Sequence, residues 1–240
     1  MDQNLVKPIC PKPIGWLEYT LNQEEIDFLW RMIEDKKGSW KSHLIGHVSG
    51  SYALEDDNNW FFETVCLPLI NRYIDEFKNM GKQTPITGYA PYHLDQWWVN
   101  FQQQTEFNPV HTHSGVYSFV IWMKIPTHYK DQQKLPISSN STSGVISNFE
   151  FSYIDLFGRI RSYESLMRPE LEGTLVFFPA KMVHQVYPFF GEGERRSMAM
   201  NWAVYDSEDE LKRYMNEAQI KAFEEHKKNN GGEHPEGYQE

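Results

Sequence analysis

The chain has 240 residues, of which 40% are hydrophobic and 15% aromatic, enough apolar side chain for a folded core and too much for a disordered protein. Its formal net charge of −10 disfavours a nucleic-acid partner or an anionic membrane surface. The two cysteines, Cys10 and Cys66, are too few for a disulfide scaffold or a four-thiolate zinc site, and they favour a reducing, cytoplasmic location.

Helical spacing marks two segments in the first part of the chain. Asn22 is placed to cap a helix that ends near Gly38, because apolar residues recur on one face from Ile26 onward. A second helical pattern follows Asp56 and ends by Gly81. We expect both helices to be amphipathic supports and assign residues 1–87 to this helical part.

From about Gly88 the hydrophobic period shortens to that of β-strands. Short aromatic and β-branched runs, separated by Gly, Pro, Asn and Ser, predict an antiparallel sandwich or barrel over residues 88–205. The runs are QWWVNFQ, GVYSFVIWMKIP, NFEFSYID, GRIRSYES, TLVFFP, HQVYPF and RSMAMNWAVY. A polar connection over residues 130–148 is expected to be a mobile loop, and residues 206–240 a C-terminal helix with a tail. We therefore expect one domain over residues 1–240.

Two histidines lie just before the most apolar strand. His111 and His113 are two positions apart, so in an extended chain both side chains point to the same side. His184 follows a later strand, and a barrel can bring such distant strand ends together. Three neutral imidazoles could then bind one divalent transition metal.

The last strand has two different faces. One carries Arg195, Ser197, Ala199 and Asn201. The other carries Arg196, Met198, Met200, Trp202 and Val204. The small residues of the first face leave room for a ligand, which suggests a cavity wall. There the fork of Arg195 matches a carboxylate and Ser197 adds a hydroxyl donor. Arg196 is expected to lie over aromatic surface.

These motifs, in this order, resemble the 2-oxoglutarate- and Fe(II)-dependent oxygenases, in particular those common in marine phages and some bacteria. The resemblance covers roughly residues 97–201 and rests on WVNFQQQTEFNPVHTHSGVYSFVIWMKIP, GTLVFFPAKMVHQVYPF and RRSMAMN. It implies a double-stranded β-helix, with a jelly-roll or cupin-like core, in which a His-x-Asp/Glu pair and a distal histidine hold iron. By the same resemblance, His111 and His184 are iron ligands, and Arg195 with Ser197 binds the far carboxylate of 2-oxoglutarate.

The chain departs from the family pattern at His113, which stands where a carboxylate is usual. Either the site is a three-histidine variant or a carboxylate comes from elsewhere, with Asp155 and Glu106 as the candidates. Two further residues are candidates for co-substrate binding: Asn100, on a polar strand face, and Tyr117, which has the same parity as the two histidines.

The resemblance implies an enzyme that uses Fe(II), 2-oxoglutarate and O2 to hydroxylate an unidentified substrate, with release of succinate and CO2. The 130–148 loop would be its lid. Two alternatives remain: a non-catalytic jelly-roll module that binds a carboxylate or sugar, and a three-histidine cupin-type dioxygenase that does not use 2-oxoglutarate.

Further expectations concern location and assembly. No membrane span or signal peptide is evident, so we expect a soluble, cytoplasmic protein, in the host cell if a phage encodes it. A homodimer through the flanking helices stays open.

Overall fold

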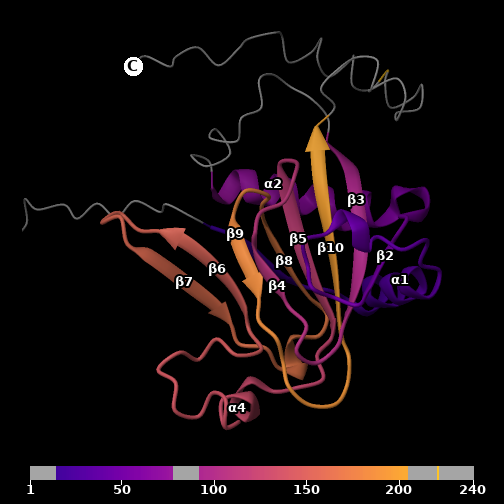
Figure 1. Ribbon diagram of the computed structural model, residues 1–240. Helices are drawn as coiled ribbons and strands as arrows, with labels where there is room; N and C mark the ends of the chain where they lie inside the picture. The colour runs from indigo at the N-terminus through magenta and orange to yellow at the C-terminus, as the bar shows by residue number, and fades with distance from the viewer. Residues whose placement is uncertain (1–14, 78–91, 205–220, 222–240) are drawn as a thin grey trace, which may run out of the picture.

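The computed structural model describes residues 15–77, 92–204 and 221, and its core consists of two antiparallel sheets (Figure 1). The larger sheet has six strands in the order β1-β8-β5-β10-β3-β2, and the smaller has four in the order β4-β9-β6-β7. The strands of the larger sheet, in sheet order, are β1 (Leu17–Thr20), β8 (Thr174–Pro179), β5 (Tyr117–Lys124), β10 (Arg195–Val204), β3 (Tyr92–Gln102) and β2 (Gly50–Ala53). Those of the smaller sheet are β4 (Asn108–His111), β9 (Val183–Val186), β6 (Phe149–Ile154) and β7 (Ile160–Ser165).

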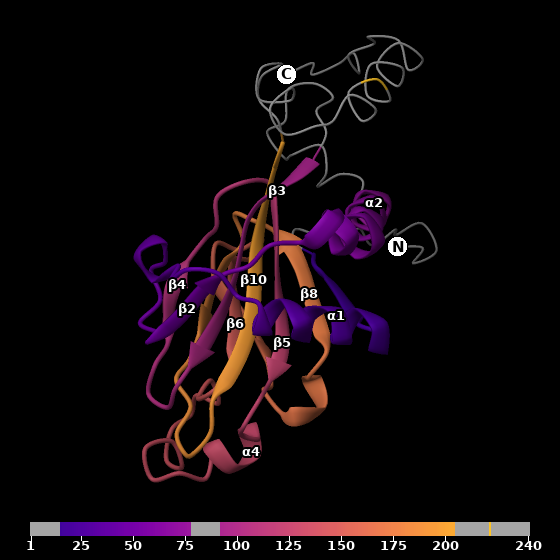
Figure 2. The same cartoon turned by 90° about the vertical axis from the view of Figure 1, so that its right-hand side faces the viewer.

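Two helices cover one face of the larger sheet, as Figure 2 shows: α1 (Gln23–Glu34) and α2 (Leu67–Glu76). Asn22 caps α1, since its side chain accepts from the Glu25 N–H at 3.0 Å and the Glu25 carboxylate accepts from the Asn22 N–H at 2.8 Å. The predicted cap is therefore confirmed, although α1 ends at Glu34 rather than near Gly38.

The remaining helical elements are short. They are the 3₁₀ turns η2 (Lys41–His43), η3 (Asp57–Asn59) and η5 (Pro169–Leu171), the π-helical turn η4 (Phe62–Cys66) before α2, and the four-residue helix α4 (Tyr129–Gln132). The C-terminal helix and tail predicted over residues 206–240 lie, apart from Lys221, outside the described residues. None of the described helices is long and apolar enough to cross a membrane.

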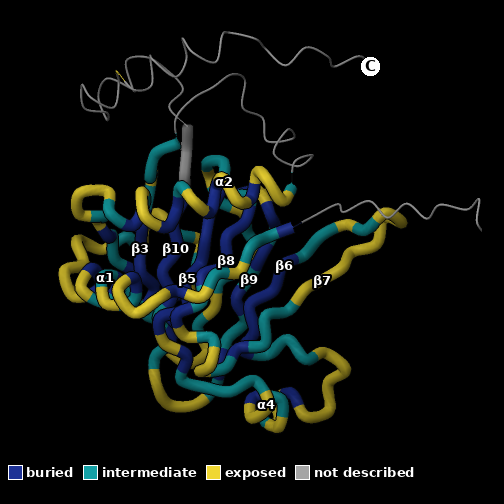
Figure 3. The backbone as a smooth tube through the Cα atoms, turned by 180° about the vertical axis from the view of Figure 1, so that it is seen from behind, coloured by how far each residue is buried: buried dark blue, intermediate teal, exposed yellow. Residues whose placement is uncertain are grey.

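The seven predicted β runs are all strands, and with β1, β2 and β4 they form the double-stranded β-helix that the family resemblance implies. Alternation along β10 separates two cores. Met198 and Met200 pack under α1 and α2, while the opposite face of the larger sheet meets the smaller sheet through residues such as Val120 and Phe178. Figure 3 shows the central strands buried and β7 exposed at the margin. The space between the sheets is where a ligand can enter.

Candidate metal centre

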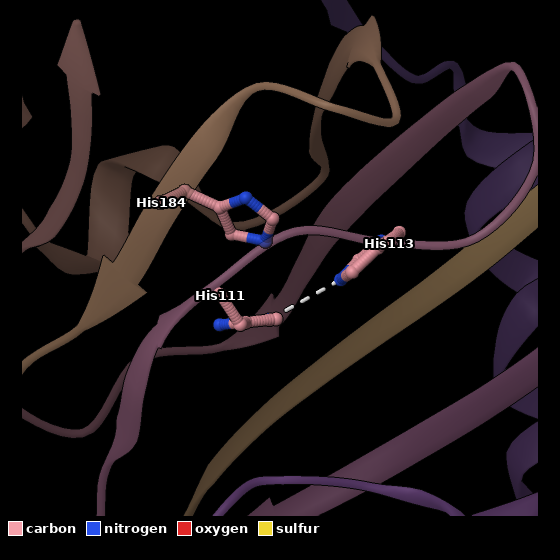
Figure 4. A group of neighbouring side chains, drawn as sticks. All are labelled: His111, His113 and His184. Atoms are coloured by element: carbon pink, nitrogen blue, oxygen red, sulfur yellow. Dashed lines mark hydrogen bonds between the residues drawn. The ribbon is translucent and has the colours of Figure 1, made fainter.

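Strand pairing brings the three histidines together. In the register of β4 and β9, His111 lies directly opposite His184, and cross-strand partners on one face are close enough for their side chains to meet. His113 follows two residues later, where its backbone N–H donates to the Ala180 carbonyl at 2.8 Å. One nitrogen from each imidazole lies within 4.8 Å of the others, and Figure 4 shows the rings converging. The structure thus brings the three imidazoles together, as the sequence predicts.

Hydrogen bonds to acceptors hold all three rings in one tautomer. Nδ1 of His111 lies 2.7 Å from the Pro109 carbonyl oxygen, and Nδ1 of His184 lies 2.8 Å from the Met182 carbonyl oxygen. A carbonyl can only accept, so both Nδ1 atoms carry the proton. Nδ1 of His113 meets the Ser118 hydroxyl, which itself donates to the Met200 carbonyl and so accepts from the ring. The Nε2 atom of each neutral ring is left with a free lone pair.

Burial keeps these imidazoles neutral. Desolvation lowers the pKa of His113 to about 3, with further lowering from His111 and Lys181. Desolvation also lowers the pKa of His111 and, well below its ordinary value, that of His184, which is 3% exposed. Neutral imidazole is the form that binds metals, so the cluster is ready for coordination near neutral pH.

The donor set fits a transition metal. The Nε2 atoms of His111 and His113 lie 3.2 Å apart, joined by the dashed line in Figure 4, with no proton assigned to either atom. Two nitrogens bound to one ion at about 2.0–2.2 Å would lie about 3.0–3.4 Å apart. A cation shared by the three lone pairs would turn their repulsion into attraction, and imidazole suits iron among other metals.

A cavity of about 160 Å³ opens beside the three histidines, between the two sheets. Among the described residues, no Asp, Glu, Lys or Arg side chain lines this cavity. Instead, it is lined by amides and hydroxyls of the larger sheet, Gln96, Asn100, Ser197 and Asn201 among them, and by the apolar side chains of Phe149 and Val186 from the smaller sheet. The predicted cavity wall on β10 is present, with Ala199 on the same face.

Arg195 lies on this same face of β10, two residues before Ser197. Its side chain is fully buried and does not line the cavity itself. Its guanidinium sits 5.1 Å from the Phe189 ring centroid and donates to the Ser147 carbonyl at 2.8 Å and, at 3.5 Å, to Gln102. Its Nε atom has no hydrogen-bond partner among the described residues. Desolvation lowers the pKa of Arg195 to about 9, as expected for a cation with only neutral partners.

The other predicted co-substrate residues divide between cavity and core. Asn100 and Ser197 are cross-strand partners and both line the cavity. Tyr117 does not: its ring packs 5.4 Å from Tyr73 and 5.1 Å from Phe177, in the core under α2. The prediction for Tyr117 is wrong because the chain turns at Gly115, with a φ of 73°, and the parity of the histidines does not carry into β5.

Neither alternative carboxylate reaches the three histidines. Asp155 accepts from the backbone N–H groups of Phe157 and Arg159 in the β6–β7 turn and pairs with Arg161. Glu106 accepts from the N–H groups of Ser49 and Gln103. Each carboxylate holds a turn, so among the described residues His113 is the third member of the cluster.

Several site residues escaped the sequence analysis. The cavity wall includes His43–Gly46, and Ser118 fixes His113. The expected lid, residues 130–148, supplies no lining residue, and its Ser147 carbonyl holds Arg195 instead. These contacts join segments far apart in the chain and have no periodicity, so no sequence signal marks them. Arg196 does lie over aromatic surface as predicted, 5.0 Å from the Phe101 ring centroid.

Ser118 is expected to control metal affinity. Ser118→Ala removes the hydroxyl that accepts the hydrogen bond from His113 Nδ1–H. The ring can then change tautomer, and its Nε2 lone pair is no longer held available for the metal. We expect the affinity for Co²⁺, measured by calorimetry, to fall about 10–100-fold. Ser138→Ala is the control, since that buried hydroxyl also donates to a carbonyl, but far from the cluster. Equal Co²⁺ affinities of Ser118→Ala and the control would contradict the prediction.

The lowered pKa values predict an acid-sensitive metal-free protein. The pKa of His113 is about 3 in the folded chain and 6.5 ordinarily. Between these two pH values the histidine is protonated in the unfolded chain but not in the folded one. Lowering the pH therefore lowers the free energy of unfolding, by up to about 1.4 kcal/mol per pH unit for each such proton. Urea denaturation from about pH 7 to about pH 5.5 measures this slope. His113→Asn should show a slope smaller by about one proton; an unchanged slope would count against a neutral, buried His113.

Comparisons with known proteins agree with this geometry. Residues 96–201 match the family model described as "Putative 2OG-Fe(II) oxygenase". No curated protein matches the chain. Among solved structures, the chain is similar to the viral collagen prolyl hydroxylase of Paramecium Bursaria Chlorella virus-1 (14% identity, 78% of this chain and 94% of that one, TM-score 0.40). It is also similar to a Pseudomonas putida prolyl-4-hydroxylase (13%, 81% and 94%, TM-score 0.41) and to AviO1 from Streptomyces viridochromogenes (11%, 79% and 90%, TM-score 0.47).

The structural similarities are too distant to carry a functional argument. The family match, however, spans the strands that hold the three histidines and Arg195. Residues 96–201 are therefore similar in sequence to the 2-oxoglutarate- and Fe(II)-dependent oxygenase family.

Proposed function

We propose that this oxygenase holds its iron through His111, His113 and His184, without a carboxylate ligand, and hydroxylates a substrate still to be identified. The observation that carries the proposal is the convergence of three Nε2 lone pairs beside a cavity whose wall leads along β10 to a buried guanidinium. Iron, when bound with 2-oxoglutarate and O2, supplies the oxidation of a C–H bond with release of succinate and CO2.

Arg195 binds the far carboxylate of 2-oxoglutarate in this proposal. It is a fully buried cation, and within the described part of the chain no carboxylate contacts it. Its Nε atom has no hydrogen-bond partner among the described residues, and a planar guanidinium can match a carboxylate in bidentate fashion. Ser197 and Asn100 lie between Arg195 and the histidines on the cavity wall, where each can donate a hydrogen bond to the co-substrate.

The aromatic wall restricts water at the centre. The Trp98 ring lies 5.6 Å from that of His113, and the Phe178 ring lies 5.0 Å from that of His184. Both side chains line the cavity. They pack the imidazoles in place and make the surroundings of the reacting bond less polar, which strengthens every electrostatic interaction there.

We also propose that residues 1–240 form one domain, with 1–87 as helical support that also supplies the edge strands β1 and β2, 88–205 as the β core and 206–240 as a C-terminal helix and tail. Helix α1 supports this division, because Leu29 packs in the same core as Met198 of β10. The cysteine usage and acidic charge favour a cytoplasmic protein without a nucleic-acid partner.

Succinate formation tests the function. Protein reconstituted anaerobically with Fe(II), then given ascorbate, 2-oxoglutarate and O2, is expected to form succinate slowly even without a prime substrate. His184→Ala should abolish this turnover because it removes a metal ligand. His128→Ala should not, since His128 only caps α4. Succinate from the wild type no higher than from His184→Ala would overturn the proposal.

Arg195 is tested by the choice of co-substrate. Wild type should bind 2-oxoglutarate at least about 100-fold more tightly than 2-oxobutanoate, which lacks the far carboxylate, because a buried charge pair is lost. Arg195→Ala should bind the two equally, measured by calorimetry on Co²⁺-loaded protein. Arg196→Ala is the control, since Arg196 faces the other way and pairs with Glu194. If wild type binds neither acid, the three-histidine dioxygenase without 2-oxoglutarate gains.

A further inference from the structure

The charge of the proposed site does not balance. Among the described residues that line the cavity there is no Asp, Glu, Lys or Arg, and the only ionisable groups are histidines. The charged group behind the wall is Arg195, a cation. Lys181, whose ammonium group donates to the His113 carbonyl at 3.1 Å, adds a second, solvent-exposed cation. Within the described part of the chain, the groups that line the cavity are therefore neutral, and the nearby charged groups named here are cations.

With a divalent metal and 2-oxoglutarate bound, the site has a net charge of +1. A divalent metal and the Arg195 guanidinium together bring three positive charges, and 2-oxoglutarate brings two negative ones. A carboxylate ligand in place of His113 would cancel the remainder, whereas an imidazole does not. Since an uncompensated charge is costly where water is restricted, this remainder attracts an anion. The overall charge of −10 acts from the outer surface and is screened beyond about 8 Å at physiological ionic strength.

We propose that the loaded cavity binds one further monoanion, which is either a carboxylate-class group of the prime substrate or a small inorganic anion. This inference rests on the proposed function. Neutral donors are in place for such a group: the amides of Gln96, Asn100 and Asn201 and the Ser114 hydroxyl all line the cavity. The same charge distribution disfavours a substrate that presents an ammonium group, because none of the described residues places a carboxylate in the cavity to pair with it.

Anion titration of Co²⁺-loaded protein with saturating 2-oxoglutarate tests the proposal. Azide and propionate are titrated separately, with calorimetry for affinity and the visible Co²⁺ spectrum to show whether the anion reaches the metal. His113→Asp adds the missing negative charge, and His113→Asn is its neutral counterpart of similar size. We expect azide or propionate to bind wild type and His113→Asn at least about tenfold more tightly than His113→Asp.

The outcomes separate the two proposals. Tighter binding of azide alone, with a change in the Co²⁺ spectrum, supports a small inorganic anion; tighter binding of propionate supports a carboxylate group on the prime substrate. If Co²⁺ and 2-oxoglutarate bind but neither anion distinguishes His113→Asn from His113→Asp, the monoanion site is rejected and the proposed function stands. If wild type binds no Co²⁺ or no 2-oxoglutarate, the proposed function itself fails.

Discussion

The antiparallel pairing of β4 with β9 is the constraint on which the site depends. It sets His111 against His184, and the turn after β4 then delivers His113 to the same point. Carbonyl oxygens and the Ser118 hydroxyl accept hydrogen bonds from the Nδ1 side of each ring. The three Nε2 lone pairs therefore point toward one another. Such outer partners fix tautomer and orientation before any metal binds, which reduces the reorganisation that binding costs.

The charges of the site are divided unusually between protein and ligands. The protein supplies three neutral imidazoles and a buried guanidinium, and among the described residues no carboxylate lines the cavity. In the proposed site, the ligands must therefore supply the negative charge. Arg195 is held meanwhile by the Ser147 carbonyl and by the face of Phe189, which accommodate a cation without neutralising it. The anion affinity proposed above is thus a property of the arrangement rather than of any one residue.

The accuracy of the sequence predictions follows the length and periodicity of each element. Long alternating runs such as β10 could be predicted together with the inward face, because side-chain direction in a strand alternates strictly. The four-residue strands β1, β2 and β4 were not predicted, because so short a segment shows its period only weakly, whereas β9, also of four residues, lies in the longer run HQVYPF. Parity also failed across Gly115, where a left-handed turn resets the direction of every side chain that follows and carries Tyr117 into the core.

The sequence by itself determined the class of fold, seven of the β-strands, the candidate ligands and the resemblance to an oxygenase family, because these depend on residue type and local order. Only the tertiary structure decided which candidates meet. It joined His113 to His111 and His184, gave Asp155 and Glu106 to turns, and brought His43–Gly46 to the cavity wall. The physical reason is that sheet register and loop packing bring together residues distant in the chain, and neither leaves a pattern that a local reading of the sequence can detect.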